Sequence, residues 1–456
     1  MLTQEIFKAN DIRGLAGGDD AQWDADGAYA LGVAFVETLD LANKEKAFVL
    51  GRDMRATGEE LSAAFARGAM ALGVDVIDIG LSSTDQLWFA SGRLELPGVQ
   101  FTASHNPATY NGIKFCLTGA RPVTAQQLIE IARRAYDFEA RHNKRNDRVI
   151  GRMRSQDLLQ AYADHVRSLV NTDDMRPLKV VIDAGNGMAG HTVPTVLEGL
   201  DLEVIGLFMD LDGTFPNHQP NPLEPENLVD AQRAVIEHGA DLALVFDGDA
   251  DRCFIIDETG EVVNPSAVTA LIASQEMARE PGATIVINTI TSRTVKEVVE
   301  DEGGELVLSR VGHTYVKAMM LEHDAIFGGE HSAHYYFREF WGADTGMLAG
   351  LHVLAMLGRS SEKLSQLVAR FDRYANSGEI NSSVADAQAT MDKVAAAFKG
   401  RGYVDFPDGL LIEGDDWWVN LRPSNTEPLL RLNVEARDPE LMASLRDEVL
   451  GLVRGE

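Results

Sequence analysis

The stretch LALVFDGDADRCFII, residues 242–256, places an acidic loop between two apolar segments. Asp247, Asp249 and Asp251 alternate with small residues after the first apolar run, and Arg252 follows without a gap. An apolar run that ends in polar residues is typical of a buried strand in an open α/β sheet, where ligands bind beyond the strand ends. Oxygen ligands of this kind suit Mg²⁺ or Ca²⁺ rather than zinc. The stretch therefore predicts a hard-cation site, and such a cation promotes phosphoryl transfer above all.

Two other interpretations of this loop stay open at this point. An EF-hand also has Asp at positions one, three and five, and Glu258 falls at position twelve, but position six is Arg252 where the turn needs Gly. The residues that follow, 253–256, have the pattern of a strand rather than of a calcium loop. A solvated acidic turn is the second alternative.

The length and composition predict a protein of several domains. The chain has 456 residues, enough for three or four domains, and an ordinary apolar fraction of 45%. We find no apolar stretch that could span a bilayer and no signal peptide at the start. Cys116 and Cys253 both lie in apolar, strand-like segments. We therefore expect buried thiols and a cytoplasmic protein.

The chain is strongly acidic, with 70 Asp and Glu against 41 Lys and Arg and a net charge of −29. Such a charge should repel nucleic acid and anionic membranes, and we expect neither as a partner. It should also repel a phosphorylated metabolite. Any anion site must then be built locally from a few Arg and Lys side chains and backbone amides.

Three stretches share one plan: an apolar strand, a turn, a segment of helical period and a second strand. This alternation predicts βαβ units and mostly parallel sheets. The stretches are spread over about 260 residues, much more than the period of a solenoid, and so predict three separate α/β domains. The expected strands are 47–50, 74–79, 179–182, 202–207, 284–287 and 305–308, and the helices are 59–72, 192–200 and 293–301.

The last part of the chain has a different pattern. From Glu379 onward it reads as helix, strand pair and helix, with strands at 417–421 and 429–434 and a helix at 441–453, which predicts an α+β unit. The charged segments 141–148 and 371–378 are expected connections. We therefore predict three similar α/β domains with mixed, mostly parallel sheets and a C-terminal α+β domain. The expected boundaries are 1–146, 147–252, 253–370 and 371–456.

A second loop, TASHNP at 102–107, follows the strand-like segment 99–101. Pro107 disfavours helical geometry before it, so the loop should be exposed at a strand end. Ser104 is a candidate nucleophile there, although a turn serine is the alternative. Tyr110-Asn111-Gly112 is a tight-turn signal, and such a turn would bring Lys114 back toward Ser104.

Two further loops carry polar side chains that suit a phosphosugar. GGEHSAH at 328–334 offers oxygens for sugar hydroxyls, although a plain surface turn has the same composition. LRPSNTEP at 421–428 combines an Arg, hydroxyls and an amide between two strands, which suits either a phosphate site or a hairpin turn.

A glycine motif at Gly185–Gly190 matches the dinucleotide fingerprint after the strand that ends at Asp183. A strand that turns tightly into a helix gives the same pattern. We favour this structural interpretation, because nothing else in the chain indicates hydride chemistry. A dehydrogenase that uses NAD remains the alternative from a different enzyme class.

Taken in order, the loops resemble those of the α-D-phosphohexomutase family, and most closely its bacterial phosphomannomutase/phosphoglucomutase branch. The resemblance covers nearly the whole chain, from Asp11-Ile12-Arg13-Gly14 to the loop at 422–426. Its specific parts are TASHNP and DGDADR. The resemblance implies four domains around a central cleft, with one loop from each.

The resemblance also implies a role for each loop. Ser104 would be the phosphoserine, and Asp247, Asp249 and Asp251 would hold Mg²⁺ together with a phosphate oxygen on it. Charge stabilisers and proton carriers would be Arg252, His105, Lys114, Arg13 and His313. Substrate-binding residues would be Glu330, Ser332, His334, Arg422, Ser424, Asn425 and Thr426.

The implied activity is an isomerisation of hexose 6-phosphate and hexose 1-phosphate, of mannose or glucose. Glucose 1,6-bisphosphate or mannose 1,6-bisphosphate would be the intermediate and activator, and the enzyme would be a monomer or weak dimer. Alternatives are a phosphoglucosamine mutase of the same family and a non-catalytic phosphosugar-binding protein. Two positions depart from the family pattern: Asn10 stands in place of Tyr, and Ala333 in place of Gly.

Overall fold

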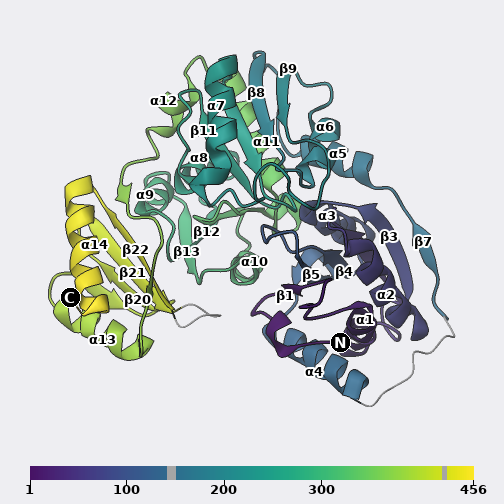
Figure 1. The fold of residues 1–456 in the computed structure, drawn as a ribbon. Helices are drawn as coiled ribbons and strands as arrows, with labels where there is room; N and C mark the ends of the chain where they lie inside the picture. The colour runs from purple at the N-terminus through teal and green to yellow at the C-terminus, as the bar shows by residue number, and fades with distance from the viewer. Residues whose placement is uncertain (141–149, 424–428, 456) are drawn as a thin grey trace. The chain divides into compact units, whose positions relative to one another are not determined.

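The computed structural model describes residues 1–140, 150–423 and 429–455 (Figure 1). These residues form two compact units. Unit 1 consists of residues 1–263 and 332–366, and unit 2 of residues 264–331 and 367–456. In the described ranges, no helix is both long enough and apolar enough to cross a membrane.

Unit 1 begins with a mixed sheet in the strand order β1-β5-β4-β2-β3-β7, with β6 beside β5. The strands β4, β2, β3 and β7 are parallel, whereas β5 runs antiparallel to both of its neighbours, β1 and β4. The helices α1, α2 and α4 pack together on one face, and α3 lies on the other (Figure 1). The bounds are β1 Ile12–Leu15, α1 Ala25–Leu39, β2 Ala47–Arg52, α2 Gly58–Ala71, β3 Asp75–Leu81, α3 Thr84–Leu94, β4 Gly98–Phe101, β5 Tyr110–Leu117, β6 Arg121–Pro122, α4 Ala125–Ala140 and β7 Met153–Ser155.

A cluster of phenylalanines holds this sheet and its helices together. Phe35 of α1 and Phe65 of α2 contact each other and the strand residues Phe48 and Phe115, with ring centroids 5.3 to 6.3 Å apart. Phe101, the last residue of β4, lies edge-on to Phe65. The strand that leads into the loop of Ser104 is therefore fixed in the core of the unit.

The second sheet of unit 1 has the order β11-β10-β8-β9. The strands β10, β8 and β9 are parallel, and β11 returns antiparallel to β10. A short antiparallel hairpin, β15-β16, also belongs to this unit. The bounds are α5 Leu159–Ser168, β8 Leu178–Asp183, α6 Ala189–Leu197, β9 Leu202–Leu207, α7 Val229–His238, β10 Leu242–Phe246, β11 Cys253–Asp257, β15 Tyr335–Phe337, β16 Ala343–Asp344 and α11 Gly346–Arg359; helix α12, Leu364–Val368, leads into unit 2.

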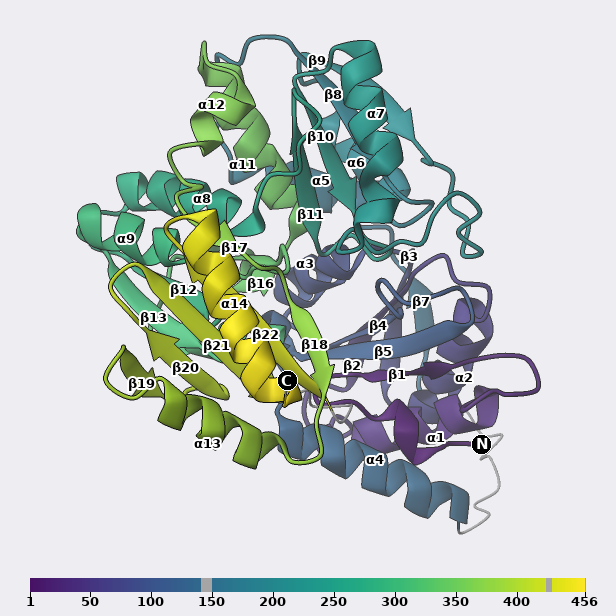
Figure 2. The same cartoon turned by 60° about the vertical axis from the view of Figure 1, so that its left-hand side comes forward.

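Unit 2 combines parallel strands with an antiparallel C-terminal sheet. In the first part, β12 pairs in parallel with β13 and β14. In the second, β17-β22-β21-β20-β19 is antiparallel, β18 pairs with β22, and α14 lies across one face (Figures 1 and 2). The bounds are α8 Pro265–Arg279, β12 Thr284–Asn288, α9 Arg293–Asp301, β13 Glu305–Ser309, α10 His313–Glu322, β14 Phe327–Gly329, β17 Ala375–Asn376, β18 Ile380–Ser383, α13 Ala387–Ala397, β19 Tyr403–Asp405, β20 Leu410–Glu413, β21 Trp417–Pro423, β22 Leu429–Ala436 and α14 Pro439–Arg454.

The predicted fold class is confirmed. Each of the three strand–helix–strand stretches forms a βαβ unit with adjacent parallel strands, namely β2-α2-β3, β8-α6-β9 and β12-α9-β13. The C-terminal part is α+β as expected. Cys116 and Cys253 are both buried free thiols, as their apolar surroundings predicted.

The predicted turn at Tyr110–Gly112 is wrong, because these residues begin strand β5. Asn111 and Gly112 pair with β1, and a Cβ atom on Gly112 would lie 2.2 Å from the carbonyl oxygen of Ile12. The glycine is thus needed for close strand approach rather than for a turn. The chain reverses earlier, between β4 and β5, and this hairpin brings Lys114 opposite Gln100.

A buried carboxyl group joins three helices of unit 1. Asp85, in the first turn of α3, accepts hydrogen bonds from Ser83, from the Tyr162 hydroxyl of α5 at 2.6 Å and from Thr345, the N-cap of α11, at 2.7 Å. Burial raises the pKa of Asp85 to about 6, against 3.8 for an ordinary Asp, although the three hydroxyl donors lower it.

The Asp85 carboxyl predicts a pH dependence of stability. The folded state keeps the Asp85 proton to a higher pH than the unfolded chain does. The free energy of unfolding should therefore fall as the pH rises from about 4 to about 6. The loss from this one group is on the order of 3 kcal/mol. Asp85→Asn, which cannot ionise, should flatten this dependence in urea unfolding measured from pH 4 to 7. If Asp85→Asn shows the same pH dependence of the free energy of unfolding as the control Asp157→Asn, the dependence comes from other groups.

Candidate active site

The acidic loop 247–252 connects β10 to β11 in unit 1, so it lies at the carboxyl end of a strand as predicted. The side chains of Asp247, Asp249 and Asp251 are fully buried. Ala250 has φ +59°, a left-handed conformation that costs free energy in any residue but glycine. The loop is therefore a constrained hairpin connection and not a solvated acidic turn.

The Ser104 loop lies directly against this acidic loop. Ser104 is buried, and its hydroxyl donates to Asp247 Oδ2 at 2.8 Å. Gly248 faces the backbone of Ser104, where a Cβ atom would lie 2.5 Å from the Ser104 carbonyl oxygen. Ser104 itself has φ +49°. Two strained loops that are far apart in the chain thus meet at one hydroxyl group.

Lys114 and Thr84 hold the second aspartate. Lys114 Nζ donates to Asp249 Oδ2 at 2.7 Å and also to Asp251 Oδ2, and Thr84 Oγ1 donates to Asp249 Oδ2 at 2.6 Å. Burial alone would raise the pKa of Asp249, but Lys114 and Thr84 outweigh it and hold that pKa well below the usual range. The same carboxylates raise the pKa of Lys114 despite its burial. Both groups are therefore charged at neutral pH.

The donor set of this loop fits a hard cation. One oxygen from each of Asp247, Asp249 and Asp251 lies within 4.8 Å of the others. Asp249 Oδ1 and Asp251 Oδ1 are buried and accept no hydrogen bond from the described residues. Buried carboxylate oxygens without donors are costly unless a cation is bound. These two oxygens are the ones that a metal ion would take.

Arg252 links the aspartates to Ser104 and His105. Its Nη2 donates to Asp247 Oδ2 at 2.7 Å, to Ser104 Oγ at 3.3 Å and to His105 Nδ1 at 2.5 Å. Burial, Arg252 and then Arg13 lower the pKa of His105 well below its usual value. His105 is thus a neutral imidazole whose Nδ1 accepts a hydrogen bond. Arg13 reaches the same loop through Asn106 Oδ1 at 2.8 Å.

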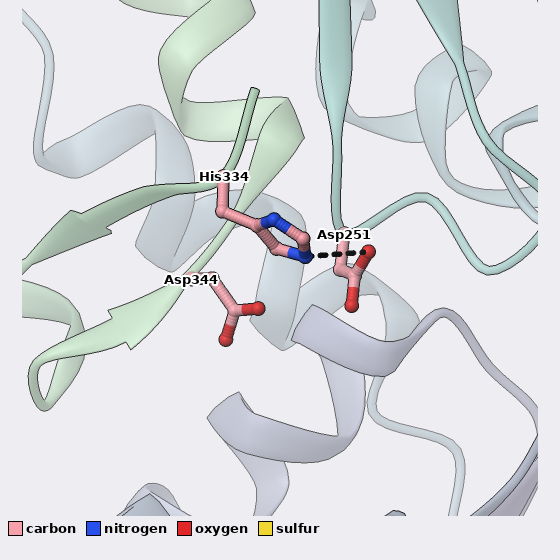
Figure 3. A group of neighbouring side chains, drawn as sticks. All are labelled: Asp251, His334 and Asp344. Atoms are coloured by element: carbon pink, nitrogen blue, oxygen red, sulfur yellow. Dashed lines mark ion pairs between the residues drawn. The ribbon is translucent and has the colours of Figure 1, made fainter. Parts of the chain in front are cut away.

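His334 approaches the acidic loop from another side. Its Nε2 lies 3.7 Å from Asp251 Oδ1, and Asp344 lies close by (Figure 3). Asp344 is buried and accepts a hydrogen bond from Trp88 Nε1 at 3.0 Å. Ser332, predicted with His334, contacts His334 Nδ1 through its hydroxyl at 3.0 Å. Unit 1 therefore brings His334 and Ser332 to the acidic loop.

Ala333, which lies between these two residues, has φ +64°. The glycine that the family pattern has at this position would adopt such a conformation without strain. The departure noted in the sequence therefore leaves the backbone in a glycine-like shape.

The remaining predicted residues lie in unit 2. Glu330 is buried after β14, and its Oε1 accepts from Asn288 Nδ2 at 2.8 Å and from Gly312 N at 3.1 Å. Gly312 caps helix α10, whose first residue is His313, so Glu330 and His313 lie at one end of this helix. Arg422, at the end of β21, donates to Glu379 Oε2 at 2.5 Å. Ser424, Asn425 and Thr426 lie outside the described residues.

Unit 2 also contains a cavity of about 560 Å³ between α9, β13 and the C-terminal sheet. Asn288, the partner of Glu330, lines it together with Trp418 and others, but none of the predicted site residues does. This cavity is therefore separate from the residues that the sequence predicts as a site.

The glycine turn 185–190 has a structural role. Met188 N donates to Gly248 O at 2.9 Å, and a Cβ atom on Gly187 would lie 2.7 Å from the same oxygen. The turn therefore supports the backbone of the acidic loop, as the structural interpretation predicts.

Sequence reasoning missed Thr84 and Arg55. Thr84 follows β3 and contacts Asp249, and Arg55 follows β2 and contacts the Ser104 loop. Both come shortly after parallel strands whose carboxyl ends share one edge of the first sheet. Their position just after a strand is the one sequence signal that they carry, and many surface threonines and arginines share it.

Comparison with known proteins gives a consistent result along the whole chain. Four consecutive family models match, described as phosphoglucomutase/phosphomannomutase alpha/beta/alpha domains I, II and III and C-terminal domain. They cover residues 4–141, 160–260, 264–374 and 379–452.

Similar proteins match over nearly their full length. A phosphomannomutase of Salmonella montevideo is 41% identical over 459 residues, which cover 98% of both chains. The phosphohexose mutases of Xanthomonas campestris pv. campestris are 39% identical over all of both chains. The crystal structure of a phosphoglucomutase/phosphomannomutase family protein from Burkholderia thailandensis superposes with a TM-score of 0.89 at 32% identity, and covers 100% of this chain and 98% of its own.

Proposed function

The chain belongs to the phosphoglucomutase/phosphomannomutase family, and from this premise we propose that it interconverts hexose 6-phosphates and hexose 1-phosphates of mannose or glucose, with Ser104 as the phosphoryl carrier. One observation above all supports the proposal. The Ser104 hydroxyl is buried between Asp247 and Arg252, next to carboxylate oxygens that suit a hard cation. No other described serine has such surroundings.

The proposed reaction has two halves that exchange one phosphoryl group each. In the first, the bond between phosphorus and Ser104 Oγ breaks, and a bond forms between phosphorus and the free sugar hydroxyl. The proton of that hydroxyl ends on Ser104 Oγ. The resulting hexose 1,6-bisphosphate turns over, and its other phosphoryl group returns to Ser104 as the proton moves back to the sugar.

The side chains around Ser104 have different proposed roles in this transfer. Arg252 and Lys114 are permanent cations, which stabilise negative charge on the transferring group. His105 orients the loop as a neutral acceptor of an Arg252 hydrogen bond. His334 lies beside the acidic loop, and we propose it as a ligand of the substrate.

We assign Mg²⁺ to Asp247, Asp249 and Asp251, where all three ligands are carboxylate oxygens. The bound cation would supply positive charge beside the oxygens of the phosphoryl group. Glucose 1,6-bisphosphate, or its mannose equivalent, would act as activator because it can phosphorylate a free Ser104.

Glu330 and Ser332 are proposed as ligands of the sugar hydroxyls, and His313 is proposed as a charge stabiliser or proton carrier. Arg422, together with Ser424, Asn425 and Thr426, would bind the phosphate that is not reacting. This assignment needs one phosphate site that accepts either end of the sugar.

The proposed domain boundaries are 1–146, 147–252, 253–370 and 371–456, each domain contributing one loop. The ranges of the four family models support this division, although the model ranges place the second boundary about ten residues later. We further propose a cytoplasmic monomer or weak dimer whose partner is a phosphosugar, without nucleic acid or membrane.

The test of the proposed function is a substrate panel. Turnover of mannose 1-phosphate, glucose 1-phosphate and glucosamine 1-phosphate is measured with Mg²⁺ and catalytic glucose 1,6-bisphosphate. We expect turnover of the first two. A clear preference for glucosamine 1-phosphate would overturn the substrate assignment, and no turnover of any would overturn the function.

Replacing Arg422 by alanine should weaken substrate binding more than the transfer step. The side chain is largely buried, and its Nε has no hydrogen-bond partner among the described residues, as expected for a group that awaits an anion. Loss of a charged hydrogen-bond donor to phosphate should raise KM about tenfold or more. Steady-state kinetics of Arg422→Ala, with the exposed Arg437→Ala as control, measures this. A lower kcat at unchanged KM would contradict the role.

A further inference from the structure

Arg55 is a buried arginine whose N–H groups all donate to the backbone around Ser104 or to Asp53. The residue follows β2, and its side chain is completely buried. Nη1 donates to the carbonyl oxygens of Pro107 at 2.7 Å and Tyr110 at 2.9 Å, and Nη2 to those of Ser104 at 2.9 Å and Asn106 at 2.6 Å. The fifth donor, Nε, contacts Asp53 at 3.2 Å. All five N–H groups of the guanidinium thus have acceptors.

Three of the four carbonyl groups belong to the loop that carries Ser104, and the fourth is that of Tyr110, the first residue of β5. This loop connects β4 to β5, and Ser104 adopts φ +49° within it. Only two short turns, Ala103 to Asn106 and Pro107 to Tyr110, pair its backbone internally. Because four carbonyl dipoles point to one centre, the loop shape depends on the planar, forked cation that lies there.

A second chain of contacts reaches the backbone of Ser104 from its amide side. Asp53 accepts from the Arg55 amide at 3.0 Å and also from the Thr102 hydroxyl. Thr102 Oγ1 in turn accepts from the Ser104 amide at 2.9 Å. The amide of Ser104 is fixed through Thr102 and Asp53, and its carbonyl directly by Arg55.

The neighbouring segment 213–215 closes this site. The ring of Phe215 lies under the guanidinium, 5.1 Å from centroid to Cζ. Gly213 lies so close that a Cβ atom there would be 2.7 Å from Arg55 Cα. The guanidinium is thus shielded from water on that face, which strengthens its hydrogen bonds to the loop.

We propose that Arg55 is a positioning residue for phosphoryl transfer: it fixes the strained Ser104 loop so that the Ser104 hydroxyl faces Asp247 and Arg252. Arg55 contacts backbone carbonyls and Asp53, so it acts on the reaction only through Ser104. Its role rests on the proposed function of Ser104 as phosphoryl carrier. Lysine cannot replace it, because an ammonium group has three donors without the planar fork.

The main experiment compares Arg55→Lys with Arg67→Lys, a control on the exposed side of α2. For Arg55→Lys we expect kcat to fall about 30- to 100-fold while KM changes less than threefold, because the nucleophile is misplaced but the substrate contacts are intact. Arg67→Lys should keep both constants. A wild-type kcat in Arg55→Lys, or a loss that appears only in KM, would overturn the proposal.

Chemical rescue and hydrogen exchange separate positioning from general stability. Guanidinium ion at sub-denaturing concentration should raise kcat of Arg55→Ala at least tenfold, whereas ammonium should not. Amide exchange should increase in peptides that cover 103–110 and not in those that cover α14. Equal effects of the two ions, or uniform exchange across the chain, would show that Arg55 serves overall stability only.

If neither Arg55→Lys nor Arg55→Ala folds, a smaller change in the same network still tests the proposal. Thr102→Val removes the acceptor of the Ser104 amide and should lower kcat about five- to tenfold at unchanged KM. An unchanged kcat would refute the positioning of Ser104 through this network. The outcomes also separate the two proposals: a wild-type protein without mutase turnover refutes the function, whereas an active wild-type protein with a normal Arg55→Lys variant refutes only the inference.

Discussion

Ser104→Ala is expected to lower mutase turnover by at least about 10³-fold, which corresponds to about 4 kcal/mol of transition-state free energy. Alanine has no oxygen to carry the phosphoryl group, so phosphoryl transfer through residue 104 cannot occur. The pocket should survive, because the partners of the hydroxyl are Asp247, His105 and Arg252, and Arg252 also donates directly to the other two. The measurement is turnover of glucose 1-phosphate with Mg²⁺ and glucose 1,6-bisphosphate.

The same variant gives a second readout that is independent of turnover. Wild-type protein treated with glucose 1,6-bisphosphate should gain the mass of one phosphoryl group, localised to Ser104 by peptide mapping, and Ser104→Ala should gain none. The matched control is Ser168→Ala, at an exposed serine of α5. Near-normal turnover of Ser104→Ala, or phosphate on another residue, would refute the assignment.

Asp249→Asn is expected to lower kcat by about 10²- to 10³-fold and to raise the cation concentration needed for half-maximal activity. Asp249 Oδ2 accepts from both Lys114 and Thr84, which leaves Oδ1 for a cation. The amide keeps the size of the side chain but removes the charge that Lys114 and a metal ion both require. The loss should therefore combine weaker metal binding with a less well placed Lys114.

Metal removal provides the reference for this variant. Treatment of the wild-type enzyme with a chelator should abolish turnover, and Mg²⁺ should restore it. Asp173→Asn, at an exposed acidic position, should retain the wild-type cation dependence. Full activity after metal removal, or an Asp249→Asn variant with unchanged cation dependence, would contradict the assignment of the cation site.

The elements of the fold could be predicted because their signals are local. Strand-like segments of four or five residues predicted β2, β8, β10 and β12, and the structure has strands there. The error at Tyr110–Gly112 shows the limit of this approach. Asn-Gly is a turn signal in a short window, but β1, about 100 residues earlier in the chain, pairs with these residues and makes them a strand.

The candidate site was predictable to the extent that its groups follow strands. Ser104, Asp247 and Glu330 each come shortly after a strand, where side chains of an α/β sheet meet ligands. Thr84 and Arg55 follow strands as well, but a lone threonine or arginine is too common in surface loops to be distinguished. Their roles appear only from the atoms that they contact.

The sequence alone determined the βαβ units, the acidic loop and the residue types that suit a cation and a nucleophile, because hydrophobic period and turn residues act over a few positions. Only the tertiary structure decided which of these groups meet. Ser104 and Asp247 are 143 residues apart, and Lys114 and Asp249 are 135 apart. It also decided that the Ser104 loop closes around Arg55, since such contacts depend on the packing of whole sheets and helices and not on any one segment.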